Sequence, residues 1–190
     1  MTHARWRCFV AVPLGVELRA ALAAAVDGGR ARDELAGLRW ANPDGWHLTL
    51  AFLGAVEPGD VPAIRAAVAS AAARHLRWRT RTGGVGGFPA AGRARVAWYG
   101  VSDPDGRLAT LAGDLRATLG VDEGGRFRPH VTLARARREP VDLRGWVADT
   151  SAPEGELVVD RLELMRSHLG AGPARYETLA TASIGGPKRV

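Results

Sequence analysis

Apolar and polar residues recur along the chain with two periods, one typical of strands and the other of helices. Short apolar or alternating segments predict strands at residues 6–12, 38–41, 47–53, 78–82, 95–101, 130–133, 157–165 and 176–184. Apolar residues at three- and four-residue spacing predict helices over 16–26, 61–75, 108–119 and 143–147. Strands and helices therefore alternate through both halves of the chain.

This order predicts an α+β fold of two related lobes. Each lobe is expected to hold an antiparallel-rich sheet with helices on its outer face. The two uncovered faces would enclose a central cleft, with one histidine-bearing strand from each lobe. We expect a single bilobal domain over residues 1–184 and a C-terminal tail over 185–190.

One pattern, His-x-Thr-Leu, occurs twice, at residues 47–50 and 130–133. Successive side chains of a strand point to opposite faces, so each histidine shares a face with its threonine while the aliphatic residues share the other. Two imidazoles facing each other across a cleft can remove one proton and supply another near neutral pH. Phosphodiester cleavage needs both steps, and threonine hydroxyls can bind the same anion or orient the histidines. The candidate residues are His47, His130, Thr49 and Thr132.

Composition and charge restrict the class of protein. The 190 residues are 46% hydrophobic and 24% charged, which is ordinary globular composition, so disorder is not expected. The net charge of +6 favours anionic partners such as nucleic acids, although Lys188 is the only lysine and this use of arginine can equally reflect genome composition. No apolar run is long enough for a membrane span, and Pro13 interrupts the apolar start too early for a signal peptide. The single cysteine, Cys8, excludes an internal disulfide, and we expect a cytoplasmic protein without a membrane partner.

Other features have a structural as well as a chemical interpretation. The glycine-rich stretch at 83–87 could cradle a phosphate, but it lacks Gly-Lys-Ser/Thr, and a bulge or tight turn is favoured. A metal site is disfavoured, because no His-Glu-x-x-His motif, cysteine pair or tight acidic cluster accompanies the two histidines. The six tryptophans are dispersed, which favours packing over a stacking platform for bases.

Longer segments around both histidine motifs, and others along the chain, match a known family. They read FVAVP at 9–13, WHLTLAFLG at 46–54, GFP at 87–89, FRPHVTLAR at 127–135 and LMRSHL at 164–169, followed by Tyr176. On these residues the chain resembles the 2H phosphoesterase family, and within it the RNA 2′,3′-cyclic phosphodiesterases that are also called 2′-5′ RNA ligases. The resemblance covers nearly the whole chain.

The resemblance implies a reaction and roles for single residues. His47 would be the general acid that protonates the leaving 3′ oxygen, and His130 the general base that activates water. Thr49 and Thr132 match positions that contact the phosphate, and Arg135 matches a basic position that holds it. The substrates would be RNA ends bearing a 2′,3′-cyclic phosphate, tRNA fragments among them, and the product a 2′-phosphate end. The expected enzyme is monomeric and uses neither metal nor cofactor; with an RNA 5′-hydroxyl in place of water, it would make 2′-5′ linkages without ATP.

Several points stay open. Strict alternation places Arg135 on the face opposite His130, so a bulge or the strand end would have to turn it into the cleft. Phe9 could line the cleft, while a structural role is favoured for Ser167 and His168. Two alternative functions are a sibling enzyme that opens small cyclic nucleotide phosphates or joins tRNA halves, and a non-catalytic basic RNA-binding protein.

Overall fold

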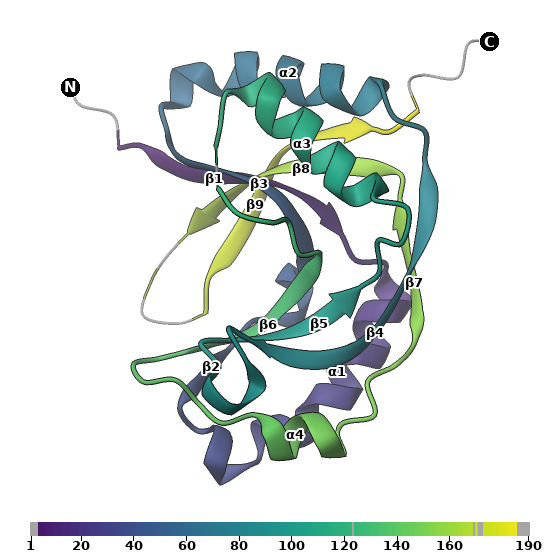
Figure 1. The fold of residues 1–190 in the computed structure, drawn as a ribbon. Coiled ribbons are helices and arrows are strands. Elements are labelled where there is room, and N and C mark those ends of the chain that lie inside the picture. The colour runs from purple at the N-terminus through teal and green to yellow at the C-terminus, as the bar shows by residue number, and fades with distance from the viewer. Residues whose placement is uncertain (1–3, 123, 169, 171–172, 186–190) are drawn as a thin grey trace.

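Nine antiparallel strands form a curled sheet in the computed structural model, which describes residues 4–122, 124–168, 170 and 173–185 (Figure 1). The strands are β1 (Trp6–Pro13), β2 (Leu38–Trp40), β3 (His47–Val56), β4 (Trp78–Phe88), β5 (Val96–Val101), β6 (His130–Ala136), β7 (Gly155–Val159), β8 (Arg161–His168) and β9 (Arg175–Ser183). Their order across the sheet is β7-β4-β5-β6-β3-β1-β8-β9, and β2 pairs with β6. Helices and strands thus occur in the mixture that was predicted.

The two sets of strands expected in separate lobes meet in the middle of this sheet. Within the described residues, β3 and β6 are joined by one residue pair, Leu48 opposite Val131. From this junction β3 leads to β1, β8 and β9, whereas β6 leads to β5, β4 and β7. The result is one continuous sheet rather than two, and its narrow junction holds the two histidine-bearing strands side by side.

The helices of the described part of the chain are α1 (Val16–Arg30), α2 (Val61–Ala73), α3 (Arg107–Leu119) and α4 (Arg144–Asp149). In α3 the residues Leu108, Leu111 and Leu115, spaced three and four apart, are fully buried, so one face of this helix packs on the sheet. None of the helices in the described ranges has both the length and the apolar composition that a membrane crossing requires.

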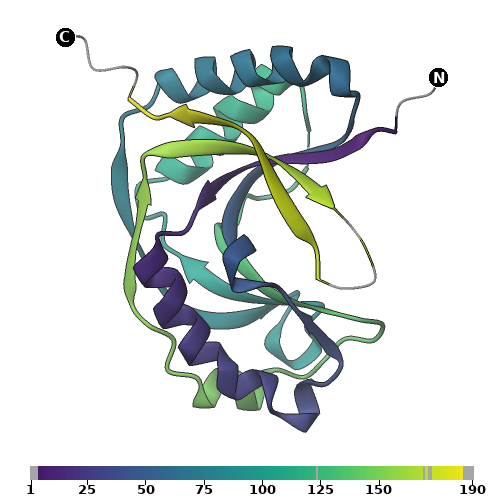
Figure 2. The same cartoon turned by 180° about the vertical axis from the view of Figure 1, so that it is seen from behind.

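The helices do not stay with the strands that precede them. α3 follows β5 in sequence but packs on α2 and β3, above the half of the sheet that holds β8 and β9 (Figure 1). α1 follows β1 but runs along the other half, where it contacts β7 (Figure 2). This exchange ties the two halves of the sheet together.

Two expectations about single segments are settled by the sheet. The strand expected over 157–165 is two strands, because the chain passes at Asp160 from the half where β7 pairs with β4 to the half where β8 pairs with β1; alternation alone does not show such a crossover. The glycine-rich stretch 83–87 lies inside β4, where the register shifts between Thr82 and Val85, so the predicted bulge is confirmed. Most of the expected tail, 186–190, lies outside the described residues.

Candidate active site

The two His-x-Thr segments present equivalent faces at the junction of β3 and β6. In both strands the histidine and threonine are half-buried and the aliphatic residues between them are buried. Because the strands are antiparallel and Leu48 lies opposite Val131, the register brings His47 toward Thr132 and Thr49 toward His130. Two imidazoles and two hydroxyls are therefore grouped on one face.

A bulge follows each histidine motif and changes the face of the next residues. In β6, Thr132 and Ala134 pair with consecutive residues of β5, so Leu133 is the extra residue, and both Leu133 and Ala134 are buried. In β3, Leu50 is the extra residue in the same position. After a bulge the alternation is displaced by one residue. Arg135 thus returns to the face of His130, as its expected role required, and Phe52 takes the equivalent place in β3.

The ring orientation of both histidines is fixed in the same way. Nδ1 of His47 lies 2.6 Å from the carbonyl oxygen of Gly45, and Nδ1 of His130 lies 2.7 Å from that of Arg128. A carbonyl oxygen only accepts, so each Nδ1 carries the hydrogen and donates it. In the neutral rings Nε2 is then the unprotonated nitrogen. Each histidine can therefore take up or release a proton at Nε2 without losing its anchor.

The turn that anchors His47 is encoded by the sequence NPDG just before β3. Residues Pro43–Gly45 form a 3₁₀ turn, whose first backbone NH groups are partly satisfied by the side chain of Asn42, which accepts from the NH of Asp44. The turn places the Gly45 carbonyl oxygen within hydrogen-bond distance of Nδ1 of His47. A sequence with strong turn residues therefore fixes the tautomer of a histidine two positions later.

Aromatic side chains surround the two histidines unequally. Phe9 stacks on His47 with ring centroids 4.6 Å apart, and Tyr176 meets the same ring edge-on at 5.1 Å. His130 has an edge-on contact with Phe88 at 4.9 Å. Phe9, which was expected to be able to line the cleft, is buried against the His47 ring and is not among the residues that line the pocket beside it. The placement of Phe88 and Tyr176 could not be predicted, because their contacts depend on strands far away in sequence.

Burial and positive charge lower the pKa of both histidines. Loss of solvent is the largest cause for His47, whose pKa falls to about 4; the Arg135 guanidinium and His130 contribute, and the hydrogen bond to Gly45 opposes the shift. The pKa of His130 is also lowered, again mainly by burial and then by Arg135. Both rings therefore favour the neutral form in the free protein, and His47 does so more strongly.

Arg135 is the basic residue of the site. Its side chain is exposed, and its charge acts on His47, His130 and Tyr176. Among the described residues it makes no ion pair with a carboxylate, so its charge is available to an anion. His168, by contrast, pairs with Glu177 at 2.8 Å on the outer strands β8 and β9, in keeping with the structural role favoured for it.

A pocket of about 430 Å³ opens beside His47. Its walls include Trp46, His47, Met165, Tyr176 and Thr178. Nowhere in the described ranges do three or more His, Cys, Asp or Glu side chains come together as they would around a metal ion. The site thus consists of two neutral imidazoles, two hydroxyls and one guanidinium, a set suited to proton transfer on a phosphate ester.

Comparison with known proteins places this arrangement in a family. The model of the 2′-5′ RNA ligase superfamily matches residues 18–171. The chain belongs to this superfamily. The resemblance seen in the sequence is confirmed, and this superfamily member is 34% identical over 196 residues to an RNA 2′,3′-cyclic phosphodiesterase of Thermus thermophilus, an alignment that covers 95% of this chain and 91% of the relative.

A second relative and two solved structures extend the comparison. An RNA 2′,3′-cyclic phosphodiesterase of Geobacillus stearothermophilus is 32% identical over 181 residues; the match covers 90% of this superfamily member but 55% of the relative, so the chain spans about half of that relative's length. The protein TT0787 of Thermus thermophilus superposes with a TM-score of 0.73 at 28% identity, covering 95% of this chain and 98% of the other. E. coli LigT complexed with phosphate gives 0.68 at 26% identity, covering 97% and 100%.

Proposed function

We propose that the protein hydrolyses 2′,3′-cyclic phosphate ends of RNA to 2′-phosphate ends, with His47 and His130 as the acid–base pair. The observation that supports this best is the matched pair of imidazoles, each anchored through Nδ1 and grouped with threonine hydroxyls and Arg135 on one face. Two relatives are named for this activity, and E. coli LigT, which has this fold, was crystallised with phosphate.

In the proposed reaction Nε2 of His130 removes a proton from water as the water oxygen bonds to phosphorus. The bond between phosphorus and the 3′ oxygen breaks, and Nε2 of His47 gives its proton to that oxygen. The phosphate stays on the 2′ oxygen, and the pair of histidines ends with the same number of protons as it began. Thr49, Thr132 and Arg135 would hold the non-bridging oxygens, where negative charge increases.

The lowered pKa values bear on which histidine is the acid. Because burial lowers the pKa of His47 more strongly, a single proton on the free pair resides on His130 in preference to His47. The bound phosphate anion favours the charged form of both rings, so the proposed roles require that the substrate bring the proton to His47.

A substrate with sulfur in place of the 3′ bridging oxygen tests these roles, because a thiolate leaves without help from an acid. His47→Ala should recover most of its lost rate on that substrate, and His130→Ala should not. Recovery of the His130 variant alone would exchange the two roles.

The first experiment incubates the purified protein, in EDTA, with a short RNA that ends in a 2′,3′-cyclic phosphate. We expect a 2′-phosphate product, and His47→Ala and His130→Ala should each lower the rate by about 10²- to 10⁴-fold. His168→Ala is the matched control, because this histidine is bonded to Glu177 on the outer strands. A full rate in either site variant, or a 3′-phosphate product, would contradict the proposal.

The same experiment separates the alternatives. Turnover of a cyclic mononucleotide but not of the RNA would favour the sibling activity, and tight RNA binding without turnover would favour the binding protein. Reverse ligation is tested by adding an RNA with a 5′-hydroxyl and analysing the products for a 2′-5′ linkage. These three assays use the unmodified protein.

A further inference from the structure

Two arginines lie directly opposite each other next to the site. In the pairing of β2 with β6, Arg39 faces Arg135, and opposed residues of an antiparallel ladder project to the same side of the sheet. The neighbours of Arg39 turn the other way: Leu38 is buried, and Trp40 packs edge-on against Trp146 of α4. Arg39 therefore extends the face that holds the histidines.

Like charges directly opposite each other in a ladder are destabilising. Carboxylates usually relieve such a contact, yet in the part of the chain that the structure describes neither Arg39 nor Arg135 forms an ion pair. Both side chains are exposed. Within the described residues, these two adjacent positive charges are therefore not neutralised by a carboxylate.

The positive charge continues beyond this pair. Arg137 directly follows β6 and donates from Nε to the Leu38 carbonyl of β2 at 3.2 Å, and Arg39, Arg137 and Arg138 line one cavity of about 810 Å³. Two acidic residues of that cavity are already bonded to other arginines, Glu34 to Arg32 at 2.6 Å and Asp142 to Arg144 at 2.6 Å, which leaves Glu139 as the remaining carboxylate. We call Arg39, Arg135, Arg137 and Arg138 the arginine row.

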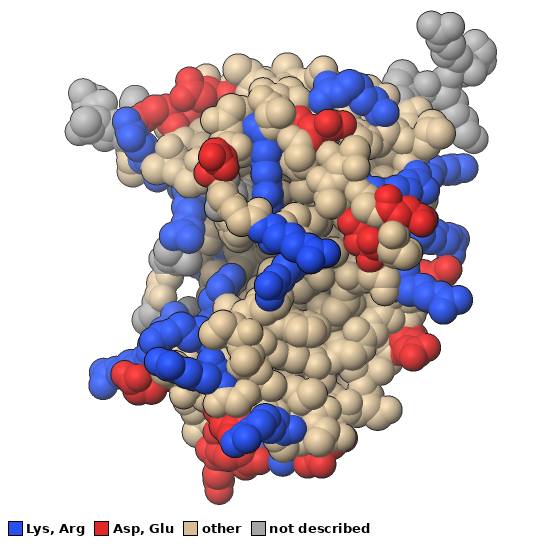
Figure 3. All heavy atoms as spheres, viewed as in Figure 1, with Lys and Arg blue, Asp and Glu red and all other residues tan. Residues whose placement is uncertain are grey.

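The pocket beside His47 differs in this respect. It also has arginines in its wall, but Arg19 lies 3.9 Å from Asp44 and Arg161 lies 3.5 Å from Glu163, within the same pocket. The charges of Arg19 and Arg161 are therefore partly compensated, whereas Arg175 in the same wall forms no ion pair within the described residues. Figure 3 shows basic side chains gathered over the region of β2 and β6 in Figure 1.

We propose that the arginine row binds the internal phosphodiesters of the RNA strand whose cyclic phosphate end lies between the two histidines. This inference rests on the proposed function. It adds the direction in which the RNA strand leaves the two histidines, and it requires an RNA long enough to reach the arginine row. Arg135 lies near the end of β6 and Arg137 directly follows this strand, so the two side chains can contact neighbouring phosphates of one RNA strand. Arg39 and Arg138 then bind the same strand from the side.

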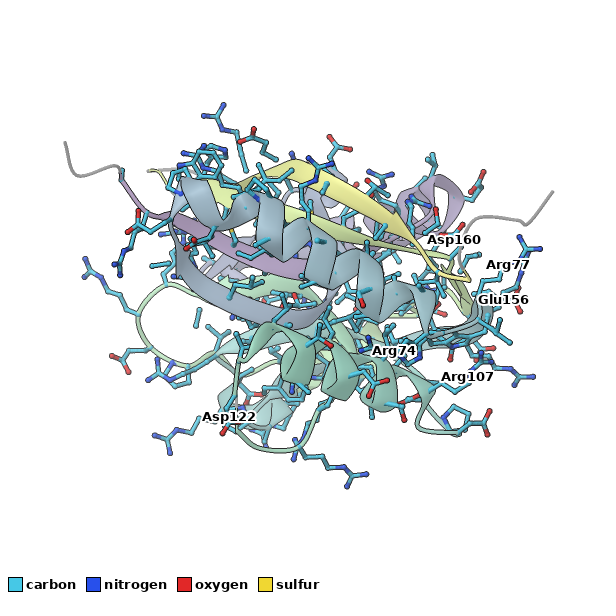
Figure 4. The ribbon with its side chains drawn as sticks, turned by 90° about the horizontal axis from the view of Figure 1, so that it is seen from above. Arg74, Arg77, Arg107, Asp122, Glu156 and Asp160 are labelled. Atoms are coloured by element: carbon cyan, nitrogen blue, oxygen red, sulfur yellow. The ribbon has the colours of Figure 1, made fainter. Side chains whose placement is uncertain are left out.

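The test compares two substrates of different length. The double variant Arg39→Gln/Arg138→Gln should lower kcat/KM for an RNA of about six nucleotides at least about tenfold, but should change kcat/KM for a cyclic mononucleotide less than about twofold, because the latter has no internal phosphodiester. Arg65→Gln/Arg77→Gln is the control for net charge, since both arginines are exposed and lie outside the cavity of the arginine row, with Arg77 at one edge of the molecule (Figure 4). An equal effect on both substrates, or on neither, would overturn the inference.

A measurement of RNA binding tests the arginine row even if the protein does not catalyse the proposed reaction. The dissociation constant of a fluorescent RNA with a 2′-phosphate end is measured at several salt concentrations. Loss of two phosphate contacts should lower the salt slope by about 1.4, whereas the control Arg65→Gln/Arg77→Gln should leave it unchanged. Unchanged affinity and slope in the double variant would refute the arginine row as a phosphate site. Absence of turnover with a normal slope change would refute only the proposed function.

Discussion

Raising the pH from 6.5 to 8 is expected to lower kcat/KM for a cyclic phosphate substrate by more than about tenfold and at most about 30-fold, the limit set by tenfold per pH unit. The proposed reaction needs one proton on the pair of histidines and one free imidazole nitrogen. The pKa of His47 is about 4, and that of His130 is below its ordinary value of 6.5. Above the higher of the two pKa values, the fraction of free protein with one proton on the pair falls tenfold per pH unit.

The direction of this pH dependence follows from the cause of the lowered pKa values. Burial and the charge of Arg135 disfavour the imidazolium form, so both transitions move to lower pH and the optimum of kcat/KM lies below 6.5. The profile of kcat should extend to higher pH, because the bound phosphate anion stabilises the imidazolium. Binding of the phosphate anion therefore raises the pKa of both histidines, whereas burial of the rings lowers it.

The measurement uses initial rates from about pH 4.5 to 8.5 at constant ionic strength, a range that covers the alkaline limb of the kcat/KM profile. Arg135→Gln is the diagnostic variant, because removal of its charge raises the pKa of both rings: the alkaline limb of kcat/KM should move to higher pH although the maximum falls. A kcat/KM that is flat or rises between pH 6.5 and 8 would refute the assignment of catalysis to this pair. An unmoved limb in Arg135→Gln would refute the electrostatic cause.

Three further changes have defined outcomes. Because the folded-state pKa of His47 is about 4 against 6.5 when unfolded, the free energy of unfolding should fall by about 3 kcal/mol as the pH is lowered from 7 to below 4, and His47→Asn should lack this part of the loss in urea titrations. EDTA should leave kcat unchanged, since both proton transfers are placed on imidazoles; a rate restored only by a divalent metal would contradict this. Leu48→Ala should cost about 2–5 kcal/mol in urea titrations and also reduce kcat, because Leu48 is buried at the junction of β3 and β6; an unchanged kcat would argue against alignment by this contact.

Much of the site was predictable because it depends on local rules. Alternation in a strand places His47 with Thr49 and His130 with Thr132, and the structure puts these residues on one face. The conflict over Arg135 was informative, since a residue on the wrong face by strict alternation required a bulge, and β6 contains one. When strand alternation puts a residue on one face and its expected role requires the other, the conflict can thus predict a bulge in the strand.

The rest depends on contacts between distant segments, which periodicity does not report. The exchange of α1 and α3 between the two halves follows from packing of complete faces, and the crossover at Asp160 lies inside an unbroken alternating pattern. Neither Tyr176 beside His47 nor Arg39 opposite Arg135 has a local signal. Each becomes visible once the register between strands is known.

The repeated motif makes the two histidines alike, and the residues outside it make them different. Both rings donate Nδ1–H to a carbonyl two residues earlier, and both are followed by a bulge. At the equivalent position after the bulge, β3 has Phe52 and β6 has Arg135, so this position supplies a positive charge from β6 and not from β3. An acid and a base need different surroundings. The repeated motif therefore places both imidazoles, and their different chemical environments come from neighbouring residues outside the motif.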